Sequence, residues 1–411
     1  MTLLLHGAQK LDADGIVDDF WMLAESARIT ATGTGDGWRS QLALAAQRRI
    51  PGSTQHATSW NREIDTESPA FGADEIEVVD AEGAWLTPGF IDLHGHGGGG
   101  FAFDDGADAI RSALAVHRAH GTTRSVISLV ANPPHVLSAS LDAIARLAAD
   151  DPTVLGAHLE GPFLAPSRKG AHNPDFLGVP TRHVLKQLLE ASEGRLVQVT
   201  IAPELPGALE AIDTFVASGV VVAVGHTDAT LEVTREAFAR GATLLTHAFN
   251  AMPGIHHRDP GPVTAALDDD RVTLELIADG IHVHPAVIEA AFRAAPSRIA
   301  LITDAMAAAD SPDGPYRLGT LDVDVTHGRA VLAGTDTIAG STLTQDAALR
   351  TTIAAGVDPV TAITALTATP AHVLGRSHDL GRLAPGYQAD AVLLSAAYEA
   401  KRVIAEGHFL T

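Results

Sequence analysis

The sequence predicts an α/β fold, in which a (β/α)8 TIM-type barrel carries a small β-sandwich domain built from the N- and C-terminal segments. Two observations favour this class. Eight short apolar runs alternate with Ala-rich stretches of helical period between residues 86 and 304, and this order closes into a barrel. Polar and ionisable residues also stand at the carboxyl end of many of these runs, where such barrels place their active sites.

The barrel strands are expected wherever an apolar, β-rich run is bounded by turn residues. These runs are 86–93, 124–130, 154–159, 196–201, 220–224, 243–248, 272–277 and 299–303. The helices expected between them are 108–120, 138–149, 182–190, 208–218 and 231–240. After residue 304 the pattern indicates a β-like segment at 316–331, helices at 342–355 and 360–368, and final strands near 391–394 and 403–404.

The same pattern divides the chain into three segments. Residues 1–84 are expected to begin the small β domain, residues 85–375 to form the barrel, and residues 376–411 to complete the β domain. Residues 33–75 are rich in Gly, Ser, Thr and charge without a sustained period. An irregular insertion is therefore expected at about 33–75.

Composition narrows the class of protein. Hydrophobic residues make up 46% of the chain and charged residues 19%, which suits a globular enzyme with an extensive buried sheet. The formal net charge of −22 should repel nucleic acid and anionic membranes. Because there are no cysteines, disulfides, thiolate nucleophiles and thiolate ligands are excluded. No apolar run approaches a membrane span or a secretion signal, so a cytoplasmic location is expected.

The first motif with chemical content is PGFIDLHGHGGGG at 88–100, an apolar run that ends in His94 and His96. Two histidines at i and i+2 on a strand point to the same side, so both imidazoles can reach one metal at a barrel mouth. A pair of surface histidines before a flexible glycine loop is the alternative for this motif alone.

Four further strands end in a potential ligand. Glu160 ends the third strand, His226 the fifth, His247 the sixth and Asp304 the eighth. A single histidine on an apolar strand, such as His158, is more often a satisfied core residue than a ligand. Five strands that end alike instead indicate a hydrolytic metal site, with zinc or another first-row divalent ion suited to the ligands.

These motifs carry a resemblance to a known family. PGFIDLHGHGG, HLEGPF, KGAHNP, GHTDA, THAFNAM, IADGIHV and ITDAM follow one another from residue 88 to 306, with AGSTLT at 339–344. In this order the chain resembles the N-acetylglucosamine-6-phosphate deacetylases of the amidohydrolase superfamily. The resemblance implies hydrolysis of the acetamide of N-acetyl-D-glucosamine 6-phosphate to D-glucosamine 6-phosphate and acetate, in amino sugar metabolism.

The resemblance also implies roles for individual residues. It assigns Glu160, His226 and His247 to the main metal, which is expected to be Zn²⁺, with Fe²⁺, Mn²⁺ or Co²⁺ as alternatives. Asp304 would be the catalytic acid and base, taking a proton from metal-activated water and returning it to the departing amine. His172 would polarise the acetamide oxygen.

A second metal is left open by the pair His94 and His96. Some family members replace both residues and use one metal, so keeping the pair leaves one or two metals per chain. Many superfamily relatives bridge two metals with a carboxylated lysine. None of the four lysines of this chain ends a core strand, so Glu160 would have to bridge.

Substrate contacts follow from the same resemblance. Asn250, through its side chain, and Ala251, through its backbone, resemble the sugar-phosphate contacts of the family. Arg258 and His282 resemble its phosphate ligands. In the family the matching arginine reaches across a dimer interface, so a homodimer is expected.

Three alternatives stay open. A cyclic amidohydrolase of the dihydroorotase or hydantoinase type is favoured by the HxH pair and Asp304, but the missing bridging lysine counts against it. A non-catalytic sugar-phosphate-binding or metal-binding protein would be expected to lose Asp304 or a ligand, and none is lost. N-acetylgalactosamine 6-phosphate remains an alternative substrate, because the two sugars differ at one hydroxyl.

Overall fold

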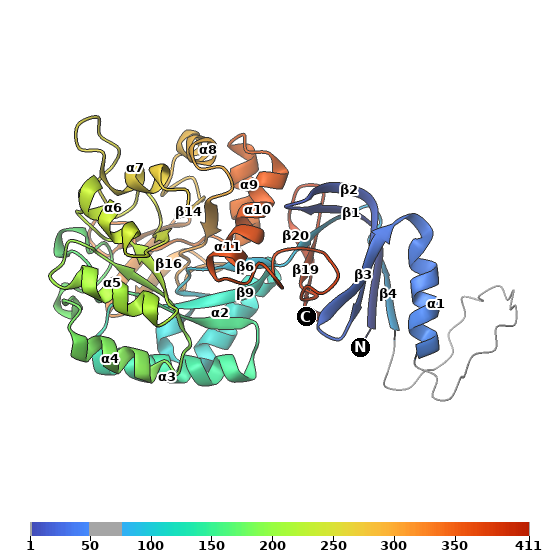
Figure 1. Cartoon of the computed structure of the whole chain (residues 1–411), viewed down its shortest axis with the longest axis horizontal. Coiled ribbons are helices and arrows are strands. Elements are labelled where there is room, and N and C mark those ends of the chain that lie inside the picture. Colours follow the sequence, from blue (N-terminus) through green and yellow to red (C-terminus); the bar gives the residue numbers. More distant parts are fainter. Residues whose placement is uncertain (1, 49–75, 411) are drawn as a thin grey trace, which may run out of the picture.

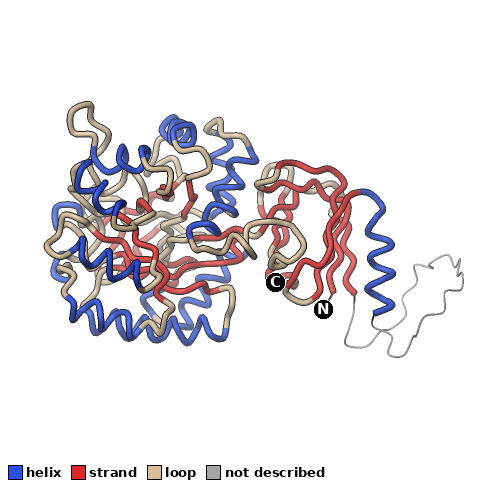
Figure 2. The backbone as a smooth tube through the Cα atoms, viewed as in Figure 1, coloured by secondary structure: helices blue, strands red, loops and turns tan. Residues whose placement is uncertain are grey.

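The computed structural model describes residues 2–48 and 76–410, which form a large α/β body and a smaller β-rich body (Figure 1). Helices surround the strands of the large body, whereas the smaller one is mostly strand (Figure 2). The predicted fold class, a barrel with a second β-rich domain, is confirmed. Within the described ranges, none of the helices has the length and apolar character needed to cross a bilayer.

The barrel is one eight-stranded sheet whose neighbouring strands are all parallel, in the order β15-β14-β13-β12-β11-β10-β9-β6. Its strands are β6 (Phe90–Asp92), β9 (Thr122–Val130), β10 (Val154–Glu160), β11 (Leu196–Ile201), β12 (Val221–Val224), β13 (Leu244–Leu245), β14 (Thr273–Ile277) and β15 (Ile299–Ile302). Every residue of β9 and of β14 is buried. Parallel strands that are covered on both faces are largely apolar, which makes the runs visible in the sequence.

Helices cover the outside of this sheet. They are α2 (Ala107–Ala119), α3 (Pro134–Asp150), α4 (Arg182–Ala191), α5 (Ala208–Ala217), α6 (Leu231–Ala239), α7 (Gly261–Asp268), α8 (Pro285–Ala294), α9 (Gln345–Ala354), α10 (Pro359–Leu366) and α11 (Ala368–Val373). In α3 the buried side chains Leu137, Leu141, Ile144 and Ala148 recur every three or four residues. This spacing places one apolar stripe of the helix against the strands.

Backbone and side-chain hydrogen bonds join the ends of the first and last strands of the barrel, β6 and β15. The Asp304 N–H donates to the His94 carbonyl over 2.8 Å. The Thr303 hydroxyl donates to Asp92 Oδ2 over 2.6 Å, and Gln345 Nε2 donates to the Ile91 carbonyl over 3.0 Å. This closure holds the strand end that carries His94 directly beside the one that carries Asp304.

Two small sheets lie beside the barrel mouth. One is the hairpin of β7 (Gly97–Gly98) and β8 (Phe101–Ala102), which follows the first histidine motif. The other is an antiparallel sheet of β16 (Gly314–Leu318), β17 (Leu321–Thr326) and β18 (Arg329–Leu332). The loop after β18 reaches the cavity of the site described below.

The β-rich domain draws its strands from both ends of the chain. Its sheet runs β21-β20-β19-β5-β1-β2-β3, and β4 also pairs with β1. The strands are β1 (Thr2–Asp12), β2 (Gly15–Glu25), β3 (Arg28–Thr34), β4 (Ile76–Asp80), β5 (Trp85–Pro88), β19 (Ala391–Leu394), β20 (Ala400–Ala405) and β21 (His408–Leu410). The antiparallel pairing of β19 with β5 joins the C-terminal strands to the N-terminal ones. The exact domain limits at residues 84 and 375 stay a prediction.

The expected irregular insertion at 33–75 is wrong in its first part, because Trp38–Arg48 forms helix α1. Trp38 and Leu42 pack, with Ala45, against strand residues of the β domain, and the Trp38 ring stacks on His6 at 4.3 Å between centroids. Most of its apolar residues are consecutive, from Leu42 to Ala46, and do not recur every three or four positions, so the helical period is weak in the sequence. Residues 49–75 lie outside the described residues.

A buried ion pair ties the barrel to the β domain. Arg124, at the start of β9, is 1% exposed, and its Nε donates to Asp390 Oδ2 over 2.6 Å. Its Nη2 pairs with Glu406, and its Nη1 donates to the Pro152 carbonyl over 2.6 Å. Asp390 is buried, and this burial raises the pKa of its carboxyl.

We expect Arg124→Met to lower the free energy of unfolding by about 3–5 kcal/mol, because it leaves Asp390 buried without its partner. The denaturant midpoint measures this loss. The matched control is Arg235→Met, which removes an exposed pair with Asp268 and should cost about 1 kcal/mol or less. Equal losses in the two variants would contradict a stabilising role for the buried pair.

Candidate active site

The potential ligands meet at the carboxyl ends of the barrel strands. Glu160 is the last residue of β10. His94, His226, His247 and Asp304 each stand two positions after the end of β6, β12, β13 and β15. The last three have positive φ values of +47°, +27° and +47°. Such backbone conformations are costly for residues other than glycine and cluster at functional sites, where they turn side chains into the mouth.

One ligand group consists of Glu160, His226 and His247. Glu160 Oε1 lies 3.0 Å from His226 Nε2 and 3.1 Å from His247 Nε2, and the two Nε2 atoms are 3.0 Å apart. Tetrahedral ligands placed ~2.0–2.1 Å from a zinc ion would lie about 3.3 Å from one another. The three donor atoms therefore converge at a spacing that fits one divalent cation.

The tautomer of His226 agrees with this fit. Its Nδ1–H donates to the Arg168 carbonyl over 2.7 Å. The ring proton is then on Nδ1, and the lone pair of Nε2 faces Glu160 and His247. Metal-ligating histidines are commonly fixed in this way by a carbonyl or carboxylate on the other ring nitrogen.

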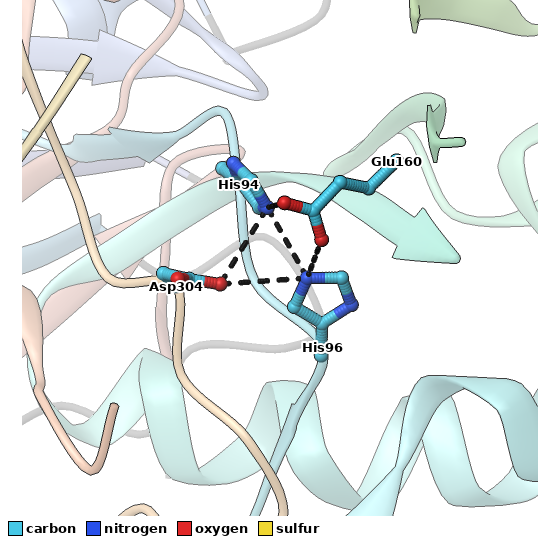
Figure 3. A group of neighbouring side chains, drawn as sticks. All are labelled: His94, His96, Glu160 and Asp304. Carbon is cyan, nitrogen blue, oxygen red and sulfur yellow. Dashed lines mark hydrogen bonds and ion pairs between the residues drawn. The ribbon is translucent and has the colours of Figure 1, made fainter. Parts of the chain in front are cut away.

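A second ligand group consists of His94, His96, Glu160 and Asp304 (Figure 3). His96 Nε2 lies 3.0 Å from Glu160 Oε2 and 3.4 Å from Asp304 Oδ1. His94 Nε2 lies 3.1 Å from His96 Nε2 and 3.5 Å from Asp304 Oδ1. Glu160 Oε1 faces His226 and His247 and also lies 3.5 Å from His94 Nε2, whereas Oε2 faces His96, so this carboxylate stands between the two groups.

The electrostatics of the site favour bound cations. Burial opposes the ionisation of Glu160, but His94 and His172 outweigh it and hold the pKa of Glu160 well below its usual range. Burial likewise acts against Asp304, yet His94 and His96 lower the pKa of this carboxyl to about 2. In turn Asp304 and Glu160 overcome burial and raise the pKa of His96 to about 9. A divalent cation can replace the positive charge that these protonated rings supply in its absence.

His172 also reaches the site, as expected. It is 4% exposed, and its Nε2 lies 3.3 Å from Glu160 Oε2. The Ala131 N–H donates to His172 Nδ1 over 3.2 Å, so the ring proton is on Nε2. Burial lowers the pKa of His172. The side chain is thus a neutral donor whose N–H faces the ligand cluster.

His158 is a core residue, not a ligand. Its Nδ1 lies 2.9 Å from the Ser128 hydroxyl and its Nε2 lies 2.8 Å from the Thr200 hydroxyl. Burial lowers the pKa of this ring well below its usual range. Because a hydroxyl contacts each ring nitrogen, His158 fits the description of a satisfied core residue that the sequence analysis gave for it.

A cavity of about 430 Å³ opens onto the ligands. Asn250, Ala251 and His282 line it together with His172 and Asp304. His282 is held by Asp279, whose Oδ2 lies 2.7 Å from His282 Nδ1. Burial acts to lower the pKa of His282, but Asp279 outweighs it and raises that pKa.

Arg258 is the candidate that the structure does not bring to this cavity. Its side chain is exposed, and its Nη1 lies 2.8 Å from His257 Nε2. Within one chain, the phosphate ligands expected from the sequence are therefore separated. His282 faces the cavity and Arg258 lies outside its lining.

Several lining residues were missed by the sequence analysis. Ser167 and Arg168 line one part of the cavity, and Asp336, Thr337 and Ile338 line another. In the sequence, the signal for Asp336, Thr337 and Ile338 was their position immediately before the AGSTLT segment. Glu275, a buried glutamate on β14 that contacts the His94 ring, was also missed. A glutamate inside the apolar run VTLELI was the signal for it.

Comparison with known proteins agrees with the site. The model of the amidohydrolase family matches residues 85–410. An N-acetylgalactosamine-6-phosphate deacetylase from Escherichia coli O157:H7 is 41% identical, over 81% of this chain and 89% of the relative. An N-acetylglucosamine-6-phosphate deacetylase from Danio rerio is 38% identical, over 77% and 82%.

Among solved structures, a mutant N-acetyl-D-glucosamine-6-phosphate deacetylase from Mycobacterium smegmatis, in complex with N-acetyl-D-glucosamine-6-phosphate, is 38% identical with a TM-score of 0.86. The match covers 100% of this chain and 99% of that one. The fold, the ligand cluster and these relatives agree with one another, and the chain belongs to the amidohydrolase family.

Proposed function

We propose that this protein is a divalent-metal-dependent deacetylase that hydrolyses the acetamide of N-acetyl-D-glucosamine 6-phosphate to D-glucosamine 6-phosphate and acetate. The observation that carries the proposal is the convergence of Glu160, His226 and His247 beside Asp304 and His172, in one cavity at the barrel mouth. The deacetylases among the relatives support the reaction class.

Each residue has a separate task in this proposal. Glu160, His226 and His247 hold the main cation, with Zn²⁺ as our choice and Fe²⁺, Mn²⁺ or Co²⁺ as alternatives. When bound there, such a cation supplies Lewis-acid activation of water. Asp304, whose carboxyl is ionised at neutral pH, accepts the proton of the attacking water and delivers it to the departing nitrogen. His172 donates its Nε2–H to the acetamide oxygen as negative charge develops there.

The sugar phosphate is placed by residues on the cavity wall. We propose that Asn250 and Ala251 contact the sugar and its phosphate, and that His282 contacts the phosphate. Their shared place in the cavity lining supports this assignment. A cytoplasmic location, and independence from nucleic acid and membranes, stay predictions from the sequence.

N-acetylgalactosamine 6-phosphate is the second candidate substrate. The relative from Escherichia coli O157:H7, at 41% identity, carries the name of that deacetylase. The test is acetate release from purified, metal-loaded protein with both epimeric 6-phosphates, unphosphorylated N-acetylglucosamine and dihydroorotate. We expect the highest kcat/KM on N-acetylglucosamine 6-phosphate. A preference for the galactose epimer would select the second candidate, and turnover of dihydroorotate alone would reject both.

We expect two metals per chain at saturation, with different affinities. Apart from the shared Glu160, the second group offers His94, His96 and Asp304, and Asp304 is the proposed proton acceptor, so we expect the cation of this group to be the weaker one. Elemental analysis measures the number of metals per chain, and zinc titration of metal-depleted protein measures the two affinities. His96→Ala should remove the weaker event and keep the stronger one. One metal per chain at saturation, with His96→Ala fully active, would contradict the second site.

We expect Arg258→Ala to raise KM for the 6-phosphate by about ten- to a hundredfold, the ~1.5–3 kcal/mol of a hydrogen bond to a charged group. Hydrolysis of unphosphorylated N-acetylglucosamine should stay nearly unchanged. We propose that Arg258 serves the partner subunit of a homodimer, which fits its exposed place outside the cavity of its own chain.

The matched control is Arg271→Ala, an exposed arginine that pairs with Asp269. It should leave KM for both sugars unchanged. Equal losses on both sugars for Arg258→Ala would assign that arginine a structural role. A monomer that keeps full affinity for the 6-phosphate at high dilution would remove the shared site.

A further inference from the structure

Glu275 is a fully buried carboxylate that the proposed mechanism does not use. It stands in the middle of β14, inside the barrel, between apolar neighbours Leu274 and Leu276, and is 0% exposed. Burying a carboxylate is costly unless donors satisfy its oxygens. Its presence at this position therefore calls for a set of specific partners.

Glu275 has three hydrogen-bond partners, which come from the residues after β6, the residues after β13, and strand β11. Oε2 lies 3.3 Å from His94 Nδ1 and accepts from the His247 backbone N–H over 3.4 Å. Oε1 accepts from Gln198 Nε2 over 2.8 Å. Gln198 Nε2 and the His247 N–H can only donate, so the Glu275 oxygens act as acceptors toward them. Glu275 thus touches one residue from each ligand group, the His94 ring and the His247 backbone.

The contact with His94 has a chemical consequence. Only a protonated nitrogen can donate to a carboxylate, so the proton of a neutral His94 ring is on Nδ1. The lone pair of Nε2 then faces Glu160 and Asp304, each 3.5 Å away. His96 differs, because its buried Nδ1 has no hydrogen-bond partner among the described residues. Of these two histidines, His94 is the one whose Nδ1 is held by a hydrogen-bond partner, Glu275.

We propose that Glu275 is a positioning residue for the second metal, which holds His94 in the tautomer and orientation that present Nε2 to the cation. The inference rests on the proposed metal centre and adds a residue outside its ligand set. Partners of this kind typically change metal affinity ~10–100-fold. Because Glu275 reaches the His94 ring but only the backbone of His247, its effect should fall mainly on the weaker site.

The test is calorimetric titration of metal-depleted, full-length protein with Zn²⁺ alone. The parent should show two binding events, and His94→Ala should lack the weaker one. Glu275→Leu should weaken that same event about tenfold or more, with the stronger event changed by less than about threefold. In the His94→Ala background the substitution Glu275→Leu should have no further effect, since Glu275 acts through that ring.

Glu275→Gln provides the rescue. Its amide oxygen can still accept from His94, and Gln198, whose Oε1 has no hydrogen-bond partner in the described part of the chain, can rotate to accept from the new amide. We expect a smaller loss than in Glu275→Leu, confined to the same event. If Glu275→Leu does not fold, Glu275→Gln and the double variant Glu275→Gln with His94→Ala test the same proposal by the same titration.

The matched control is Gln345→Leu, which removes another fully buried polar side chain of the barrel without touching a ligand side chain. Both zinc affinities should be unchanged. An unchanged weaker event in the Glu275 variants, a loss of the stronger event in Glu275→Leu as large as that of the weaker one, or a single zinc event in the parent would overturn the proposal. Acetate release by the parent is measured separately. Its absence, with two zinc events present, would reject the proposed function and leave the role of Glu275 standing.

Discussion

Asp304→Asn is expected to lower kcat for acetate release about a thousandfold or more, while the cation held by Glu160, His226 and His247 stays bound. The amide keeps the shape of the side chain but cannot accept the proton of the attacking water. Burial of Asp304 beside His94 and His96 means that no exposed carboxylate can easily replace it. Steady-state acetate release and elemental analysis of the same sample give the two quantities.

The control for this substitution is Asp310→Asn, an exposed aspartate in the following loop, which should keep kcat within about twofold. Parental turnover in Asp304→Asn with its metal intact would remove Asp304 from the proton transfer. Loss of both metals would instead make Asp304 chiefly a ligand.

Glu160→Gln is expected to have the largest effect on metal binding, because Glu160 alone belongs to both ligand groups. We expect zinc affinity at both sites to fall at least about a hundredfold, more than the ~10–100-fold typical of losing a partner of a ligand. Activity falls as a consequence. His247→Asn should weaken mainly the stronger event, since His247 belongs to one group.

The matched control stands on the same strand. His158→Gln replaces a buried imidazole two residues before Glu160. The ring nitrogens of His158 contact the Ser128 and Thr200 hydroxyls, and its ring packs edge-on against His94 at 4.6 Å between centroids. This variant should keep both metals. Full zinc occupancy in Glu160→Gln, measured after gel filtration, would show that the wrong residues have been assigned to the cations.

The barrel could be predicted because its strands are buried on both faces and therefore appear as apolar runs. The prediction was weaker where the chain leaves the sheet early. Residues 243–248 were expected as one strand, but β13 spans only Leu244–Leu245 before the chain turns at His247 with φ of +27°. Helix α7 begins at a Gly-Pro pair and α8 at a proline, and neither was expected from period alone.

The convergence of the ligands was predictable, since the carboxyl ends of parallel strands share one edge of a barrel. Other features depend on contacts between distant segments. The tautomer of His172 is set by the backbone of Ala131, and the anchoring of His94 by Glu275, 181 residues away in sequence. The lining by Asp336, Thr337 and Ile338 comes from a loop after the small antiparallel sheet. The sequence could mark Glu275 and the residues before AGSTLT as unusual, but it could not show which ligands or which part of the cavity they would contact.

The most direct test of the central claim is zinc add-back to metal-depleted protein, with acetate release from N-acetylglucosamine 6-phosphate recorded at each increment. We expect no release without metal and a rise to a plateau as the two sites that share Glu160 fill. Full activity in the metal-depleted protein, or no acetate at zinc saturation, would contradict it.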